Sequence, residues 1–379
     1  MYNGYKFIDS DAHILEPPDI WEQYLEPQFR REMPRSYVDY KNDPLGFGIQ
    51  VVIKDYTMPF SQEFSQSRIL LPGLGDAYED FARRGFPPQM YRLALERTGI
   101  DYMVVYPTVG LYATAVPQLS AATAAAYRRA YNNWLADFCR EAGGQVLGVA
   151  SIDLRDPEEA IKEARRCVKD FGFKAVHITP TPVGEHRLYH PCYDPLWAAI
   201  VDLDVPVGIH VSAGNAADVM LYHYLPDLWG AQSTMAFTIG NMIASAALIM
   251  GGVLERHPRL KVVHLESGAG WAAFWLDRLA AGVNGGFRGI EIPGLKLHPL
   301  EYFQRQCYIS ADQDDPGIKQ VIEVLGDDNL VTATDFSHPE GRRYSHAIEE
   351  LLALPGVSTA SKRKIMWDNA AKLYNITVP

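Results

Sequence analysis

Eight short runs rich in β-branched and aromatic residues recur along the chain, and helical stretches lie between most of them. The runs are mostly apolar throughout, the pattern of parallel strands covered on both faces. They lie at residues 6–9, 102–107, 146–152, 174–179, 205–211, 261–266, 307–311 and 330–335. Eight strands alternating with helices predict a (β/α)8 barrel of the α/β class. A doubly wound sheet is the alternative, but no GxGxxG motif follows the first run to support it.

The helical stretches carry signals for where helices begin and end. Asp156-Pro157 and Asp194-Pro195 each predict an N-cap followed by a proline in the first turn. Gly172 and Gly326 follow predicted helices, as glycines beyond a helix C-terminus do. The helices are expected at residues 121–143, 156–172, 194–203, 236–255, 270–280, 315–326 and 344–354.

The connection between the first two predicted strands is long, at about 90 residues, and rich in proline and aromatic residues. Connections of this length are usually functional. In a barrel, the loop after a strand lies over the mouth. We therefore predict one domain over residues 1–379, with residues 22–95 as an insertion that forms a lid over a substrate pocket. A surface insertion that takes part in oligomer contacts is the alternative.

Composition and charge limit the partners. The net charge of −11 argues against a nucleic-acid partner, because binding to phosphates needs a basic face. The first 13 residues lack a charged segment followed by an apolar core, so we expect no signal peptide. The cysteines are far apart and form no CxxC motif, which fits reduced thiols in a cytoplasmic enzyme. They are Cys139, Cys167, Cys192 and Cys307.

The most apolar window covers residues 236–254 and is interrupted by Thr, Asn, Ser and Gly. This makes it a poor membrane span. We expect a buried outer helix or a subunit contact there, and hence a homo-oligomer, with a dimer favoured.

Polar residues end several predicted strands, at the face where barrel enzymes build their sites. A single histidine at a strand end is commonly structural, but four strands delivering Asp, His or Glu to one rim indicate a metal site. Mixed nitrogen and oxygen ligands suit Zn²⁺, Mn²⁺ or Fe²⁺. The residues are Asp11 and His13 after the first strand, His210 on the fifth, His264 and Glu266 on the sixth, and Asp335 on the eighth, with His338 three positions later.

Seven motifs covering most of the chain resemble the amidohydrolase superfamily, in the branch that includes aminocarboxymuconate-semialdehyde, γ-resorcylate and 5-carboxyvanillate decarboxylases. The motifs are DSDAHILEPPDIW, VVYPTVGLY, AYNNWLADFC, GFKAVHITPTPVG, HPCYDPLWAAIVDLDVPVGIH, GGVLERHPRLKVVHLESGAGW and TATDFSHPEG. The resemblance implies a distorted barrel that binds one divalent metal, zinc or manganese. Carried onto this chain, the ligands are Asp11, His13, His210 and Asp335.

Two departures from the resemblance bear on the chemistry. Many relatives have His-x-His on the first strand, whereas Asp11-x-His13 is richer in oxygen and favours Mn²⁺ over Zn²⁺. The sixth-strand histidine of the decarboxylases aligns with Glu266, and His264 lies two residues earlier. Either residue is a candidate catalytic base. Alternatively, both help to hold a second metal, and two irons would allow oxygen chemistry.

Four more residues are candidates for orienting a ligand or contacting substrate: Glu16, His177, His338 and Arg278. Glu16 completes an Asp-x-His-x-x-Glu motif of this branch and is expected to orient a ligand. His177 lines the pocket or packs in the core. Arg278 faces a substrate carboxylate or forms an ion pair on a helix surface. Lys174 begins a strand, at the wrong end for a metal ligand.

The resemblance and the residues together predict a metal-dependent lyase or hydrolase acting on a small carbonyl or carboxylic-acid compound, with an aromatic or cyclic one favoured. In a decarboxylase, an acid near the metal protonates the carbon that loses CO₂. In a hydrolase, the metal lowers the pKa of bound water toward 7 and Asp335 accepts its proton. The alternatives are a dinuclear non-heme iron oxygenase and an inactive barrel that serves as a binding protein.

Overall fold

The computed structural model describes most of the chain. The described residues are 4–17, 19–33, 35–37, 50–53, 56–57, 86–108, 110–111, 116–211, 221, 223–225, 227–282, 294–338 and 344–377. The predicted lid, residues 22–95, lies partly outside these ranges. Its described part includes a small antiparallel sheet of β2 (Arg35–Tyr37), β3 (Gln50–Ile53) and β4 (Tyr56–Thr57).

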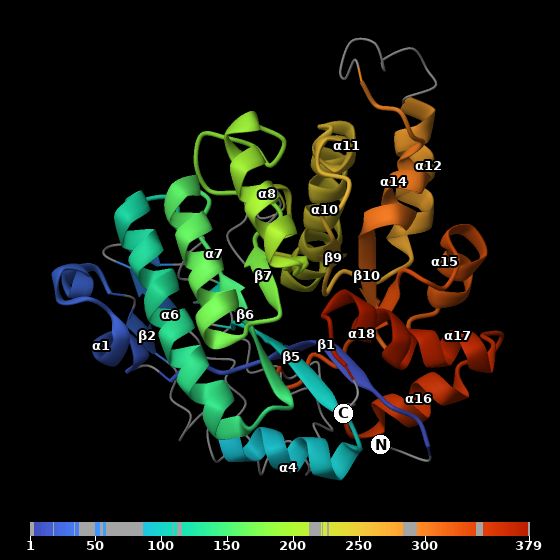
Figure 1. Ribbon diagram of the computed structural model, residues 1–379, viewed down its shortest axis with the longest axis horizontal. Coiled ribbons are helices and arrows are strands. Elements are labelled where there is room, and N and C mark those ends of the chain that lie inside the picture. Colours follow the sequence, from blue (N-terminus) through green and yellow to red (C-terminus); the bar gives the residue numbers. More distant parts are fainter. Residues whose placement is uncertain are drawn as a thin grey trace.

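Eight strands form one sheet in the order β1-β5-β6-β7-β8-β9-β10-β11, and every neighbouring pair is parallel. Each strand overlaps one of the eight predicted runs, so the predicted (β/α)8 barrel is confirmed (Figure 1). The strands are β1 (Ile8–His13), β5 (Tyr102–Tyr106), β6 (Val146–Ser151), β7 (Ala175–Ile178), β8 (Val207–Ile209), β9 (Val262–His264), β10 (Cys307–Ala311) and β11 (Leu330–Thr332).

The barrel closes through the segment that follows β11. The Asp335 amide donates a hydrogen bond to the Asp11 carbonyl (3.0 Å), and the His13 amide donates to the Phe336 carbonyl (2.7 Å). Asp9 strengthens this seam, because its buried carboxylate accepts hydrogen bonds from both the amide (3.0 Å) and the hydroxyl of Thr334. The carboxylate of Asp9 therefore ties the first strand to the last.

The first strand is longer than its apolar run. It continues to His13, with a register shift between Asp9 and Ala12, so Asp11 and His13 lie within β1 and not beyond its end. The apolar pattern stops at the first carboxylate, whereas the strand continues because β5 and the segment after β11 supply backbone partners on both sides.

Helices cover the outside of the barrel, and Figure 1 shows α6, α7 and α8 side by side along one flank. The helices are α1 (Ile20–Tyr24), α4 (Pro88–Thr98), α6 (Ala121–Ala142), α7 (Pro157–Phe171), α8 (Asp194–Leu203), α10 (Trp229–Met250), α11 (Val253–Arg256), α12 (Trp271–Gly282), α14 (Pro299–Gln306), α15 (Ile318–Leu325), α16 (Ala347–Ala353), α17 (Thr359–Arg363) and α18 (Asn369–Leu373).

Most of the predicted helix ends are confirmed. Asp156 caps α7 by accepting from two amides, and Gly172 and Gly326 end α7 and α15 with positive φ angles of 74° and 83°. Asp194 is not an N-cap, because a short 3₁₀ turn, η2 (Pro191–Tyr193), precedes α8 and Asp194 is already its first residue. Its carboxylate binds Arg256 instead.

The core has two parts. One fills the space between strands and helices, and the other lies inside the barrel, where Ile8, Val104, Val149 and Val263 meet. The inner part continues into α18 and the π-helical turn η5 (Lys364–Asp368), whose Trp367 packs on Tyr102 at the start of β5. These C-terminal elements therefore cover the end of the barrel where the strands begin, and the polar strand ends gather at the other end.

Helix α10 contains the apolar window. By length and composition alone, Gly230–Met250 would be able to cross a membrane, with a mean hydropathy of 1.4. A helix that packs against a protein core meets the same criteria, and Ala236, Ala244, Leu248 and Ile249 of this helix are buried. The expectation of a buried outer helix is met on this face.

Candidate metal centre

Side chains from four places in the barrel converge at its C-terminal mouth. Nε2 of His13 lies 3.1 Å from Nε2 of His210 and 3.3 Å from Oδ1 of Asp335. Oδ1 of Asp11 lies 3.7 Å from the first of these nitrogens and 3.6 Å from the second. Glu266 places Oε2 2.9 Å from Nε2 of His210. The four predicted ligands are thus brought together, with Glu266 beside them.

The two imidazoles point lone pairs at each other. Nδ1 of His13 lies 3.0 Å from the Pro107 carbonyl, and Nδ1 of His210 lies 2.7 Å from the Val211 carbonyl. Because carbonyl oxygens only accept, both Nδ1 atoms carry the protons and both Nε2 atoms present lone pairs when the rings are neutral. Burial keeps them neutral, since it lowers the pKa of His210 to about 4 and that of His13 well below its usual range. Two facing lone pairs at this distance repel each other, and a cation bound to both nitrogens would remove that repulsion.

The carboxylates also fit a cation. Oδ1 of Asp11 is buried and accepts no hydrogen bond from the residues that the structure describes. Burial, and then the charges of Glu266 and Asp335, raise the pKa of Asp11 well above its usual value. A divalent cation would relieve both penalties, because it replaces the lost hydration and offsets the repulsion among the carboxylates. The donor set of carboxylate oxygen and imidazole nitrogen fits Mn²⁺, Zn²⁺ or Fe²⁺.

Two residues of the cluster have unusual backbone conformations. Glu266 and Asp335 have positive φ angles of 46° and 55°, in the left-handed region that non-glycine residues rarely adopt. Such conformations cost about 1–3 kcal/mol each and gather at functional sites. Both residues lie just beyond the ends of β9 and β11, where their carboxylates join the cluster.

The left-handed turn also separates Glu266 from His264. Strand alternation predicts that these residues share a face, and that prediction is wrong because β9 ends at His264. His264 lies in the helix layer, where Nδ1 bonds to Oδ1 of Asn241 (2.9 Å) and the ring packs against Trp271 and Phe303. Among the residues that the structure describes, none of the contacts that define the cluster at the mouth includes His264.

His338 joins the cluster through Asp335. Its Nδ1 lies 3.0 Å from Oδ1 of Asp335, its Nε2 lies 2.8 Å from the Thr108 hydroxyl, and its ring stacks on His13. Glu16 holds this arrangement from behind, since it accepts hydrogen bonds from the amides of Thr108 (3.1 Å) and Gly110 (2.9 Å). Sequence reasoning missed Thr108, whose only signal is its position just after a strand.

A second buried polar group lies beneath the cluster. His177, within β7, bonds through Nδ1 to the Ser151 hydroxyl (3.1 Å), which also accepts from the guanidinium of Arg128. The His177 ring is 6.2 Å from that of His210, so it supports the site without joining it. Burial lowers the pKa of Arg128 to about 9. Arg128 was also missed; its signal is a charge on the buried face of α6.

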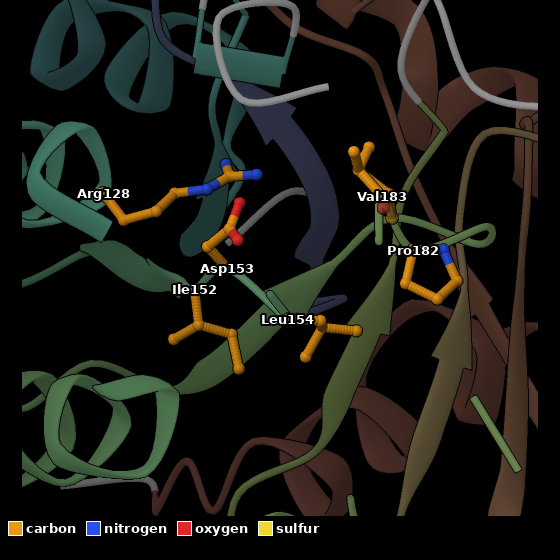
Figure 2. Close-up of a pocket in the computed structure, with 7 residues that line it drawn as sticks. Arg128, Ile152, Asp153, Leu154, Pro182 and Val183 are labelled. Atoms are coloured by element: carbon orange, nitrogen blue, oxygen red, sulfur yellow. The ribbon is translucent and has the colours of Figure 1, made fainter. Parts of the chain in front are cut away.

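The ends of β6 and β7 border a small pocket next to this group. Figure 2 shows the Arg128 guanidinium beside the Asp153 carboxylate, with Pro182 and Val183 on the opposite wall. The last predicted candidate, Arg278, lies on an exposed stretch of α12. None of the contacts that define the cluster includes it.

Exposure divides the cluster into two sets. The side chains of His13, His210 and Asp11 are 0%, 0% and 2% exposed, whereas those of Asp335, His338 and Glu266 are 13%, 15% and 23% exposed. The first set is suited to hold a metal, and only the second can also contact a molecule that enters the mouth.

A parallel (β/α)8 barrel with histidines and carboxylates gathered at the C-terminal ends of its strands has the architecture of a metal-dependent barrel enzyme. The Amidohydrolase family model matches residues 8–376, and the chain belongs to this family.

Individual relatives agree with this assignment. The γ-resorcylate decarboxylase of Rhizobium sp. (strain MTP-10005) is 27% identical over 319 residues, which cover 80% of this chain and 91% of the relative. An amidohydrolase from Mycobacterium avium subsp. paratuberculosis superposes with a TM-score of 0.76 at 22% identity, covering 98% and 99% of the two chains. A dihydroxybenzoic acid decarboxylase from Polaromonas sp. JS666, solved with manganese and the inhibitor 2-nitroresorcinol, has a TM-score of 0.66 at 17% identity, with 99% and 98% covered.

Proposed function

We propose that this chain is a metal-dependent decarboxylase that removes CO₂ from an aromatic carboxylic acid without oxidation. The observation that carries the proposal is the pair of buried imidazoles, His13 and His210, whose Nε2 atoms face each other at 3.1 Å among carboxylates. The names of the Rhizobium and Polaromonas relatives support decarboxylation in preference to hydrolysis.

In this proposal Asp11, His13, His210 and Asp335 hold one divalent cation. Manganese is favoured over zinc and iron, because two of the four donors are carboxylates and the Polaromonas structure contains manganese. A bound cation would stabilise the negative charge that the substrate's oxygen atoms carry during the reaction. The two carbonyls that accept from His13 and His210 fix the ring orientations for this purpose.

Decarboxylation replaces a carbon–carbon bond with a carbon–hydrogen bond. The electron pair of the broken bond stays with the ring carbon, which takes up a proton as CO₂ leaves. We assign the delivery of that proton to Glu266, the most exposed carboxylate of the cluster, at 23%. Asp335 orients His338 through the 3.0 Å contact, and His338 positions the substrate.

The alternatives have less support. Hydrolysis would use Asp335 as the base on the same ligands, but neither decarboxylase relative points to it. A dinuclear iron oxygenase would need additional ligands, and His264, one of the two candidates, packs in the helix layer. An inactive binding protein would have no use for the strained backbone at Glu266 and Asp335.

The test is CO₂ release from a panel of hydroxylated benzoic acids by manganese-loaded protein, with Glu266→Gln as the matched variant. We expect release that requires the metal and nearly disappears in the variant. Hydrolysis of lactones or esters by the same preparation, with no CO₂ from the panel, would overturn the proposal in favour of the hydrolase.

We further propose that residues 22–95 shape the substrate pocket and that the protein is a cytoplasmic homodimer. Support for a dimer comes from exposed apolar side chains on α10 and α12: Met235 and Ile243 at 41% and Phe274 at 62%. Light scattering should give twice the chain mass for the wild type and a smaller mass for Phe274→Glu. A monomeric wild type would refute the dimer.

A further inference from the structure

We propose that His186, His190 and Cys192 form a second metal site, selective for Zn²⁺, in the loop between β7 and α8. One donor atom from each residue lies within 4.8 Å of the others, and none of the three belongs to the cluster at the barrel mouth. This site goes beyond the proposed decarboxylase function and does not depend on it.

The loop is held in place around these residues. Leu188 lies between the two histidines and Tyr193 follows Cys192. Each is only 1% exposed, and the Tyr193 hydroxyl donates to the Leu154 carbonyl (3.0 Å). The His190 amide donates to the Arg187 carbonyl (2.8 Å), which closes a tight turn. The loop therefore needs little further ordering to present its donors together.

The three donor residues already lie close together. The rings of His186 and His190 stack with centroids 4.0 Å apart and planes 17° apart. Cys192 is a free cysteine, and its amide donates to Nδ1 of His190 (3.2 Å), which brings the two residues together. A metal bound at that nitrogen would replace this hydrogen bond.

The donor types determine the metal. Two imidazoles and one thiolate suit Zn²⁺, with water in the fourth position, and disfavour Mn²⁺, which prefers oxygen ligands. Binding requires the Cys192 thiol to lose its proton to solvent. The two sites thus differ in preference: the mouth of the barrel takes the harder ion and the loop takes the softer one.

The site also affects how metal content is interpreted. A preparation with about two ions per chain would suggest a dinuclear centre at the mouth. With zinc bound in the loop, the same count arises from two separate mononuclear sites. Cys192→Ser distinguishes the two interpretations, because it removes only the loop ion.

The experiment is a titration of reduced, metal-free protein with Co²⁺, followed by the near-ultraviolet charge-transfer band of a thiolate bound to cobalt. The cluster at the mouth contributes only nitrogen and oxygen donors, so the band reports the loop alone. The other three cysteines are poorer sources. Burial raises the pKa of Cys139 to about 12 and those of Cys167 and Cys307 still further, whereas it raises the pKa of Cys192 less.

Four variants make the titration specific. We expect the band in the wild type and in the control Cys139→Ser, its loss in Cys192→Ser, and a much weaker band in His186→Gln and His190→Asn. Asparagine keeps a side-chain acceptor for the Cys192 amide, so His190→Asn tests the imidazole separately from the turn.

Three results would overturn the proposal: no band in the wild type, a band that survives Cys192→Ser, or a band that both histidine variants leave intact. CO₂ release by the manganese-loaded Cys192→Ser variant should equal that of the wild type. Failure of this metal site is therefore distinguishable from failure of the decarboxylase function.

Discussion

His13 and His210 can share a cation because backbone carbonyls already occupy their other ring nitrogens. This arrangement fixes both tautomers without a charged partner, so the rings stay neutral and their lone pairs stay available. The other side chains of the cluster differ from one another mainly in how exposed they are at the mouth of the barrel. That difference separates residues that bind the metal from residues that act on substrate.

Glu266→Gln should separate these two roles. We expect about one bound manganese per chain, as in the wild type, and a CO₂ release that is about 100- to 10,000-fold slower, the usual loss for a general acid. Metal analysis and a CO₂ assay on the same sample provide the measurement. If the variant loses its manganese together with its activity, Glu266 is a ligand and not the proton donor.

Manganese affinity should rise with pH. Burial raises the pKa of Asp11 well above 3.8, so below that raised pKa the metal-free protein holds a proton on Asp11 that binding must displace. The imidazoles do not compete, since the pKa of His210 is lowered to about 4. Isothermal titration between pH 5 and 8 should show up to about tenfold tighter binding per pH unit at the acidic end.

The matched variant for this prediction is Asp11→Asn. It should bind more weakly and with little dependence on pH, because the competing proton is gone. If Asp11→Asn bound manganese with the same affinity as the wild type at every pH, Asp11 would not be a metal ligand whose proton competes with the metal.

The sequence predicted six of the cluster residues, because each lies at or near the end of an apolar strand signal and carries a side chain that metals bind. They are Asp11, His13, His210, Glu266, Asp335 and His338. The family resemblance singled out four of them as ligands: Asp11, His13, His210 and Asp335. The prediction that His264 and Glu266 share a face was wrong, because it assumed that strand alternation continues beyond His264, the last residue of β9. Sequence reasoning missed Thr108 because a threonine after a strand has many ordinary roles. The separation of His264 from Glu266 depends on the left-handed backbone conformation at Glu266, and no local sequence signal encodes that conformation.

Among the structural elements, the loop after β5 links the metal cluster to the first strand. Glu16, just after β1, accepts from the amides of Thr108 and Gly110, and Thr108 holds His338. Pro107, in the same loop, supplies the carbonyl that orients His13. One buried carboxylate therefore positions two of the histidines.

Glu16→Ala should loosen this loop. Leaving the two amides without their acceptor should lower the free energy of unfolding by about 1–3 kcal/mol. Urea unfolding measures this loss, and CO₂ release should fall with it. Glu16→Gln keeps one acceptor oxygen, so its stability and its CO₂ release should both fall less than those of Glu16→Ala. Wild-type stability in Glu16→Ala would show that water replaces the carboxylate at no cost.

The elements themselves were predictable where burial shapes the sequence. Parallel strands covered on both faces need continuous apolar runs, and helices such as α7 carry recognisable caps at Asp156 and Gly172. The small β2–β3–β4 sheet was not predicted, since the insertion has no clear periodic pattern. The range of α8 was predicted, but Asp194 is its first residue and not its N-cap because η2 precedes it, and turns of that kind leave little trace in sequence.

For the molecule as a whole, a bound metal would act as a cross-link, since its ligands come from the first strand, the fifth strand and the segment after the eighth. Removing it with EDTA should lower the melting temperature by roughly 3–8 °C, because a ligand that binds only the folded state stabilises it. Calorimetry of Cys192→Ser with and without EDTA measures the effect of the mouth alone. An unchanged melting temperature would contradict the cross-link.

Fold class was the most predictable property of the whole chain, and the identity of the substrate was the least. Eight strand signals spread over the chain reinforce one another, so a single misjudged boundary does not alter the barrel. In the proposed account, substrate choice would depend on pocket side chains of the insertion, and the sequence of the insertion has no clear periodic pattern from which to place them. The proposed dimer would likewise depend on a few exposed side chains of α10 and α12.

The most direct test of the metal centre is the manganese bound per chain at equilibrium dialysis, compared between Cys192→Ser and the same protein with Asp335→Ala. The first should bind about one ion per chain and the second almost none, with matching circular dichroism spectra to show that both are folded. Absence of manganese from the first protein, or equal amounts in both, would contradict a metal centre at the mouth of this barrel.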